Sequence, residues 1–224
     1  AGLMALSMGN GSMVVDANSI RVEGKNEAAT GNAANAGNFA INGYDSIEIA
    51  SAGELVFGGT GALSLDAAQV NATSARITAD TGTNYAMSAT GTLVTVSNGN
   101  TVQDQTAGLG GKLSITGEQV QLGGDIELAS GQLTVRATQG NLDVTSDARI
   151  DTASRAVKFD RFTSHTPGGN AILQSEQGDL NVASGASIDV SDGEGGNAGT
   201  LKLSAAGEAN IASGTLHGEA AAGK

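Results

Sequence analysis

The residues most able to do chemistry form a basic cluster in an otherwise acidic chain. The net charge is −12, yet several cations and one His fall within a short stretch, interleaved with two Phe: Arg149, Arg155, Lys158, Phe159, Arg161, Phe162 and His165. Cations beside aromatic rings suit a sulfated glycan or an acidic partner. We therefore predict a glycan or partner site at Arg149, Arg155, Lys158, Arg161, Phe162 and His165. The alternative is that Phe159 belongs to the core and the charges are only solvated.

Carboxylates offer two further kinds of site. Asp143, Asp151 and Asp189 occupy outward positions of predicted strands, where stacking can bring acids from neighbouring strands together. Such pairs serve polysaccharide lyases and hydrolases. Asp189, Asp192 and Glu194 lie beside glycines and are a weak candidate for calcium, which prefers oxygen ligands. We expect no other cofactor.

An enzyme is not the expected function. His165 and His217 have no recognisable partner for a nucleophilic triad. Two Tyr, four Phe and no Trp leave few aromatic walls for an active groove that stacks sugars. We predict no catalytic residues.

Composition excludes several classes of partner and site. The acidic surface would repel phosphate backbones, so we expect no nucleic acid. Absence of Cys excludes disulfides, thiol catalysis and cysteine metal ligands. No apolar run approaches the roughly 20 residues of a membrane helix, so we expect no membrane insertion.

Repetition dominates the organisation. Short units with apolar, polar, apolar residues recur every six to nine positions, as in Ile47–Ile49, Leu63–Leu65, Leu142–Val144 and Ile188–Val190. This alternation indicates strands with one buried face, and the small residues between units suit corners that wind onward. Three units make a repeat of roughly 20–24 residues, the scale of a solenoid. We predict an all-β, single-domain parallel β-helix of about nine or ten three-strand rungs, expected to be right-handed, over residues 1–224.

Four stretches break this rhythm and are predicted to be loops that leave the rod. They are residues 24–38, 97–111, 158–170 and 192–199. The last contains Gly193, Gly195 and Gly199, but a predicted strand follows where a dinucleotide fingerprint needs a helix. We interpret it as a wide corner between rungs.

The repeats also resemble a known family. Residues 110–124 (GGKLSITGEQVQLGG), 139–151 (QGNLDVTSDARID), 178–193 (GDLNVASGASIDVSDG) and 195–207 (GGNAGTLKLSAAG) are similar to the repeat region of filamentous-haemagglutinin-type exoproteins of two-partner secretion systems. The resemblance covers about residues 40–216. It implies a right-handed β-helix, an outer-membrane secretion transporter as partner, and an adhesin at the bacterial surface or outside the cell. The Asn-Pro-Asn motifs of the family's secretion domain are absent, so the resemblance implies that this chain belongs to the rod and not to the secretion domain.

The predicted function is therefore the structural rod of an extracellular adhesin, with a host-cell glycan or protein receptor. No polar cap is evident at Leu216–Lys224, so we expect the chain to continue or to stack end to end on another copy. A stacking filament or matrix subunit is thus the alternative function, followed by a β-helix lyase or hydrolase.

Overall fold

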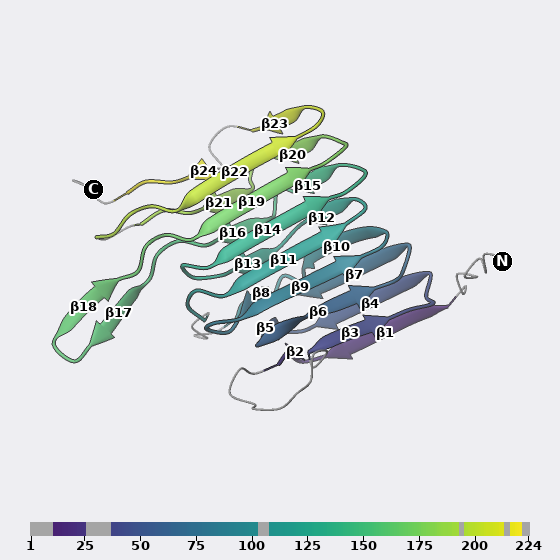
Figure 1. Cartoon of the computed structure of the whole chain (residues 1–224), viewed down its shortest axis with the longest axis horizontal. Coiled ribbons are helices and arrows are strands. Elements are labelled where there is room, and N and C mark those ends of the chain that lie inside the picture. Colours follow the sequence, from purple (N-terminus) through teal and green to yellow (C-terminus); the bar gives the residue numbers. More distant parts are fainter. Residues whose placement is uncertain (1–10, 26–36, 103–107, 193–194, 213–215, 221–224) are drawn as a thin grey trace.

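The fold was analysed in a computed structural model of the chain. The structure describes residues 11–25, 37–102, 108–192, 195–212 and 216–220. Its strands wind into a rod built from three parallel sheets, with successive coils stacked from the N-terminal to the C-terminal end (Figure 1). The predicted all-β parallel β-helix is confirmed. None of the described residues forms a helix that is long and apolar enough to cross a membrane.

Each sheet collects one strand from successive coils. The first sheet contains β1 (Ser12–Ala17), β4 (Ser46–Ser51), β7 (Gln69–Ser74), β10 (Thr92–Ser97), β12 (Val120–Leu122), β15 (Leu142–Val144), β20 (Leu180–Val182) and β23 (Ala209–Ile211). The second contains β2 (Ile20–Glu23), β5 (Glu54–Gly58), β8 (Arg76–Ala79), β13 (Asp125–Glu127), β16 (Arg149–Asp151), β21 (Ser187–Asp189) and β24 (Leu216–His217). The third contains β3 (Asn38–Ile41), β6 (Thr60–Leu65), β9 (Asn84–Ala89), β11 (Lys112–Gly117), β14 (Gln132–Ala137), β19 (Asn170–Ser175) and β22 (Thr200–Ala205).

The coil count differs from the expected nine or ten. Within the described residues the sheets have eight, seven and seven strands, so the rod has seven to eight coils there. Regular coils do have the predicted length: Ile47 pairs with Val70, and Val70 with Leu93, 23 residues apart each time. The excursions account for the difference because they lengthen individual coils. Leu142, for example, pairs with Leu180, 38 residues later.

Stacked aliphatic columns form the core. In the second sheet one buried column is continuous through Leu55, Ile77, Ile126, Ile150 and Ile188. Each such side chain contributes about 1.5–3 kcal/mol by leaving water. Alternation places the polar residues between them on the outside of the rod, so in-register pairing also stacks side chains into columns on the outer faces.

The four predicted loops have different outcomes. Residues 26–36, 103–107 and 193–194 lie outside the described residues. The described parts of 97–111 that follow β10 contribute no strand to the second sheet, so β8 pairs directly with β13. The prediction of a loop at 158–170 is wrong in part, because the excursion starts earlier and forms an antiparallel hairpin, β17 (Ala156–Phe159) and β18 (Phe162–His165). A two-residue turn, Asp160 and Arg161, joins the two strands of this hairpin. Asp160 adopts a φ of 43°, a left-handed value that Asp tolerates better than most residues.

Candidate functional site: a projecting hairpin and the outer faces of the rod

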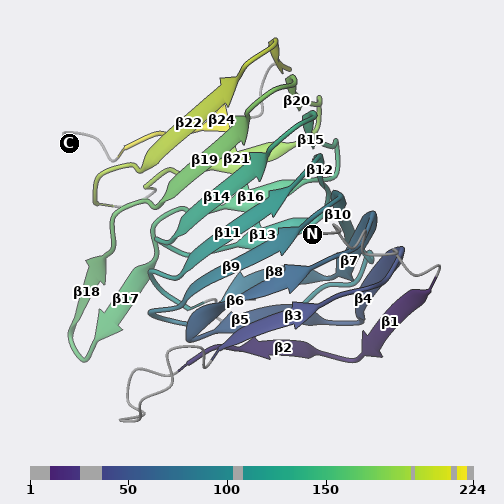
Figure 2. The ribbon, with the colours of Figure 1, turned by 45° about the vertical axis from the view of Figure 1, so that its right-hand side comes forward.

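The hairpin stands out from the rod. It leaves between β16 and β19 and points away from the coils in both views (Figures 1 and 2). The stack continues behind it, because β19 pairs in register with β14, Gln132 against Asn170. The excursion thus adds a projecting element without interrupting the third sheet.

Two aromatic rings and two cations occupy the end of the hairpin. Phe159 and Phe162 are direct cross-strand partners, and their rings stack with centroids 5.6 Å apart. They are 50% and 67% exposed, so the alternative that Phe159 is a core residue is wrong. Lys158 is exposed, and the Arg161 side chain is 95% exposed with Asp160 beside it at 3.9 Å. We call Lys158, Phe159, Asp160, Arg161 and Phe162 the hairpin tip.

The base of the hairpin is fixed by a different set of contacts. The Arg155 guanidinium donates to a Glu127 carboxylate oxygen at 2.9 Å and to Asp151 Oδ2 at 3.1 Å. It also donates to the carbonyl oxygen of Ser154 at 3.0 Å. Thr166 Oγ1 accepts from the backbone N–H of Arg155 at 2.9 Å. Arg155 therefore holds the hairpin to the second sheet.

The predicted basic cluster is consequently divided between two places. Lys158, Arg161 and Phe162 lie together at the tip. Arg149 and Arg155 lie on the rod at the base, where both pair with Asp151. His165 is the last residue of β18 and lies opposite Ala156, which places it at the base as well. Within the predicted cluster, all of which the structure describes, exposed aromatic and cationic groups lie together at the tip.

An ion-pair network links the base of the hairpin to earlier coils. Glu127 accepts from Arg155 and, at 2.6 Å, from Arg76, and Arg76 also donates to Glu54 at 2.9 Å. Burial disfavours the charged form of Arg76, but its bonds to Glu54 and Glu127 outweigh this and raise the pKa. The pKa of Arg155 is raised in the same way, with burial opposed by Glu127 and Asp151. These guanidinium groups stay charged and serve as structural ties.

Sequence reasoning missed Glu54, Arg76 and Glu127. Arg76 is 22 residues from Glu54 and 51 residues from Glu127 in the sequence. The register of the stacked coils makes them neighbours. The available signal was their position, since each is an outward residue of a second-sheet strand. Asp125 on β13 is close to the network, and the pKa of its carboxyl is raised, chiefly by burial, although Arg149 acts in the opposite direction.

The predicted carboxylates do not form one cluster. Asp151 and Asp189 are register partners on adjacent coils of the second sheet, and Glu127 precedes them in the same column. Asp143 lies on the first sheet. Asp151 is only 7% exposed and is neutralised by Arg149 and Arg155. Glu127 and Asp151 of this column are therefore tied to arginines, whereas Asp189 accepts from the backbone N–H of Ser191.

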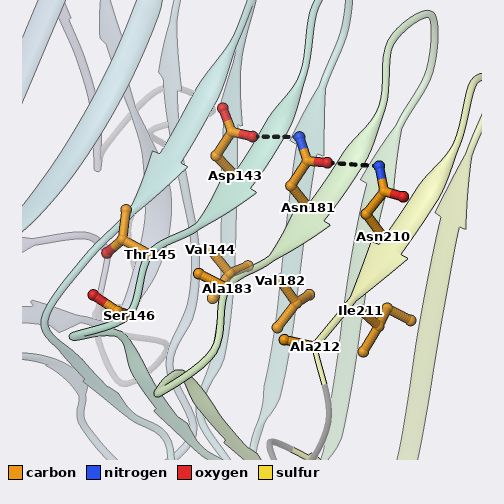
Figure 3. A pocket seen from close by; sticks show the side chains of 10 residues that line it. All are labelled: Asp143, Val144, Thr145, Ser146, Asn181, Val182, Ala183, Asn210, Ile211 and Ala212. Atoms are coloured by element: carbon orange, nitrogen blue, oxygen red, sulfur yellow. Dashed lines mark hydrogen bonds between the residues drawn. The ribbon is translucent and has the colours of Figure 1, made fainter.

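Asp143 instead begins a ladder of hydrogen bonds along the first sheet. The Asn181 amide donates to Asp143 Oδ1 at 2.7 Å, and the Asn210 amide donates to Asn181 Oδ1 at 3.0 Å (Figure 3). Each amide donates toward the preceding coil, so the ladder has one direction. It borders an open groove of about 580 Å³ whose lining is mainly apolar, with Val182, Ile211 and Ala212 among its residues.

The calcium candidate is only partly within the described residues, because Glu194 lies outside them. Asp189 Oδ1 accepts from the backbone N–H of Ser191 at 2.8 Å. Asp192 is buried, and its Oδ1 accepts from Ser154 Oγ at 2.6 Å. Across the described part of the chain, His, Asp and Glu side chains form no group of three or more that could hold a metal ion. Calcium at Asp189, Asp192 and Glu194 stays a prediction.

Comparison with protein-family models, curated proteins and solved structures finds no match to this chain.

Proposed function

We propose that this chain is the structural rod of an extracellular bacterial adhesin, and that its hairpin tip attaches to a host-cell glycan or protein receptor. The observation that carries the proposal is the hairpin itself, a projecting element that exposes two Phe and two cations on a regular stiff scaffold. Binding residues are commonly carried by excursions from a rigid framework. The resemblance of the repeats to filamentous-haemagglutinin-type rods supports the same class.

The projection of the hairpin moves the cations at its tip away from the negative charge of the rod. Four-residue strands extend roughly 14 Å at about 3.4 Å per residue. Charges interact strongly only within a Debye length of about 8 Å at physiological salt. Lys158 and Arg161 therefore meet a negatively charged receptor at a distance where most of the rod's negative charge is screened.

The remaining parts of the proposal follow from the resemblance. They are export through an outer-membrane transporter, a location at the cell surface or outside the cell, and a function that is not enzymatic. The rod contributes stiffness, because every internal strand is paired with the coils on both sides.

Charge reversal at the tip tests the proposal. The variant K158E/R161E should bind host cells and immobilised heparin less well than the unchanged protein. A matched control is K112E/K202E, which makes the same charge change at exposed positions of the third sheet. Arg155 is left intact because it holds the base of the hairpin. Equal losses in both variants would indicate general charge repulsion, and unchanged binding of K158E/R161E would refute the tip as the contact.

A stacking filament subunit is the second candidate. Core-type residues are exposed at both ends of the described rod, with Phe39 51% exposed at one end and Ile211 and Leu216 42% and 40% exposed at the other. Within the described residues, the end strands of each sheet pair on one side only, so their other edge can be joined by another β-strand. Electron micrographs across a concentration series test this candidate, which predicts fibres that lengthen as concentration rises.

A further inference from the structure

An apolar groove lies at the N-terminal end of the rod. It is formed where β1, β2 and β3 begin the stack, and it measures about 310 Å³. Its apolar lining includes Val15, Ile20, Val22, Phe39 and Ile41. In later coils the equivalent positions are also covered by the preceding coil, whereas here the same kind of side chains are left half-buried or exposed.

The hairpin tip is a second apolar feature that the described residues leave exposed. Phe159 and Phe162 lie on one face of the hairpin, together with half-buried Val157, because cross-strand partners and alternate residues share a face. Most single exposed apolar residues need no explanation, but a stacked aromatic pair on a projecting turn is typical of a contact surface.

The groove and the tip match in size. An apolar cavity of roughly 150 Å³ holds one benzene molecule. The groove, at about 310 Å³, has about twice that volume and so accommodates two aromatic rings. Phe159 and Phe162 supply two rings that are already stacked on each other, so little side-chain freedom is lost when they enter together.

The charges around the two features also match. Arg21, Glu23 and Asp80 form a connected ion-pair group at the rim, with formal charges that sum to −1. At the tip, Lys158, Asp160 and Arg161 sum to +1. Contact therefore brings together opposite net charges in a protein whose other surfaces are mostly acidic, and this favours the tip over other parts of a second copy.

The direction of the hairpin sets the geometry of the contact. In both views the hairpin runs away from the coils and slants toward the end of the rod where β1, β2 and β3 lie (Figures 1 and 2). If a second copy is related to the first by a half turn, the contact between the first copy's tip and the second copy's groove is repeated between the second copy's tip and the first copy's groove.

We propose that two copies of this chain form a two-fold dimer by exchanging hairpins, with Phe159 and Phe162 of each copy seated in the groove at Val15, Ile20, Val22, Phe39 and Ile41 of the other. The contact is reciprocal and closed, so it stops at two copies. It also covers the tip that a receptor would contact, so dimerisation and attachment compete. The dimer does not depend on the receptor's identity.

Sedimentation equilibrium without any glycan or receptor tests this proposal. From about 10 to about 500 µM, the unchanged protein should shift from the 22.0 kDa of one chain toward twice that mass. The tip variant F159S/F162S and the groove variant V22E should each weaken the dimer by at least about 100-fold, because every contact in their homodimers is altered. Val14→Ser is the matched control, since it removes a 60% exposed apolar side chain of the same end coil that does not line the groove.

Mixing the two variants gives the decisive measurement. A tip variant and a groove variant together retain one intact contact of the two, so an equimolar mixture should form heterodimers although neither variant dimerises alone. Circular dichroism and melting confirm that each variant is folded. The proposal is overturned by an unchanged protein that stays monomeric, by a dimer that survives F159S/F162S, or by masses that grow beyond two copies. Loss of heparin binding in K158E/R161E while the protein is monomeric would leave the adhesin proposal standing alone.

Discussion

Replacement of Glu127 by Gln tests how the second sheet is held together. Glu127 accepts from Arg76 at 2.6 Å and from Arg155 at 2.9 Å, and its side chain is 23% exposed. Exposed ion pairs contribute about 0–1 kcal/mol, and loss of one partner of a buried pair costs about 3–5 kcal/mol. The Glu127 side chain is partly buried, so the cost of replacing it should lie between these limits. After the substitution, Arg76 still pairs with Glu54 and Arg155 still pairs with Asp151. We expect Glu127→Gln to lower the free energy of unfolding by about 1–3 kcal/mol.

Glu23→Gln is the matched control. Glu23 is also an outward residue of a second-sheet strand and also pairs with an arginine, Arg21, but both side chains are about half exposed. We expect a cost of about 0–1 kcal/mol. For a chain of this length, 2 kcal/mol corresponds to a fall in Tm of about 4–8 °C. Thermal and denaturant unfolding followed by circular dichroism measure both variants. Equal losses in Glu127→Gln and Glu23→Gln would refute the argument that half-burial strengthens the network.

Three further substitutions probe the coils, the outer ladder and pH dependence. Gly199→Ala should lower the free energy of unfolding by more than about 2 kcal/mol, because the added Cβ would clash with the carbonyl oxygen of Gly169. Gly218→Ala has room for a Cβ and should be nearly neutral, so equal denaturant midpoints for the two variants would contradict this reasoning. Asn181→Leu should cost about 1–2 kcal/mol by removing both hydrogen bonds of the first-sheet ladder, and a wild-type melting temperature would contradict this. Partial burial raises the pKa of the Asp125 carboxyl, although the residue keeps contact with solvent. The folded state therefore binds this proton more tightly than the unfolded state, and the carboxyl destabilises the fold once pH rises above its pKa. Asp125→Asn should be slightly stabilising at pH 7 and neutral near pH 3, and equal effects at both pH values would be inconsistent with this reasoning.

The sequence was sufficient for the architecture because its signal is local and repeated. Units such as Leu142–Val144 and Ile188–Val190 specify a buried and an exposed face by alternation alone, and their spacing predicts coils of the observed length. Among the aliphatic columns of the interior, Phe57 and Tyr85 pack with ring centroids 5.3 Å apart.

The candidate site was harder to predict because it depends on register and on a short turn. Proximity in sequence grouped Arg155 with Arg161, but the paired strands β17 and β18 separate the tip from the base. Arg155 instead meets Glu127, 28 residues earlier, through stacking of coils. Periodicity carries no information on which outward residues share a column, so the ion-pair network was invisible until the coils were aligned.

The stacking of coils also determines how the rod responds to force. Its hydrogen bonds between strands run along the stack, and the chain enters at one end and leaves at the other (Figure 1). Tension applied between the ends therefore loads the bonds of one coil at a time, and coils detach in sequence. Each regular coil of 23 residues releases roughly 80 Å of chain at about 3.5 Å per residue. A rod of this construction lengthens stepwise under tension and dissipates work at every step while the coils that remain stay stacked.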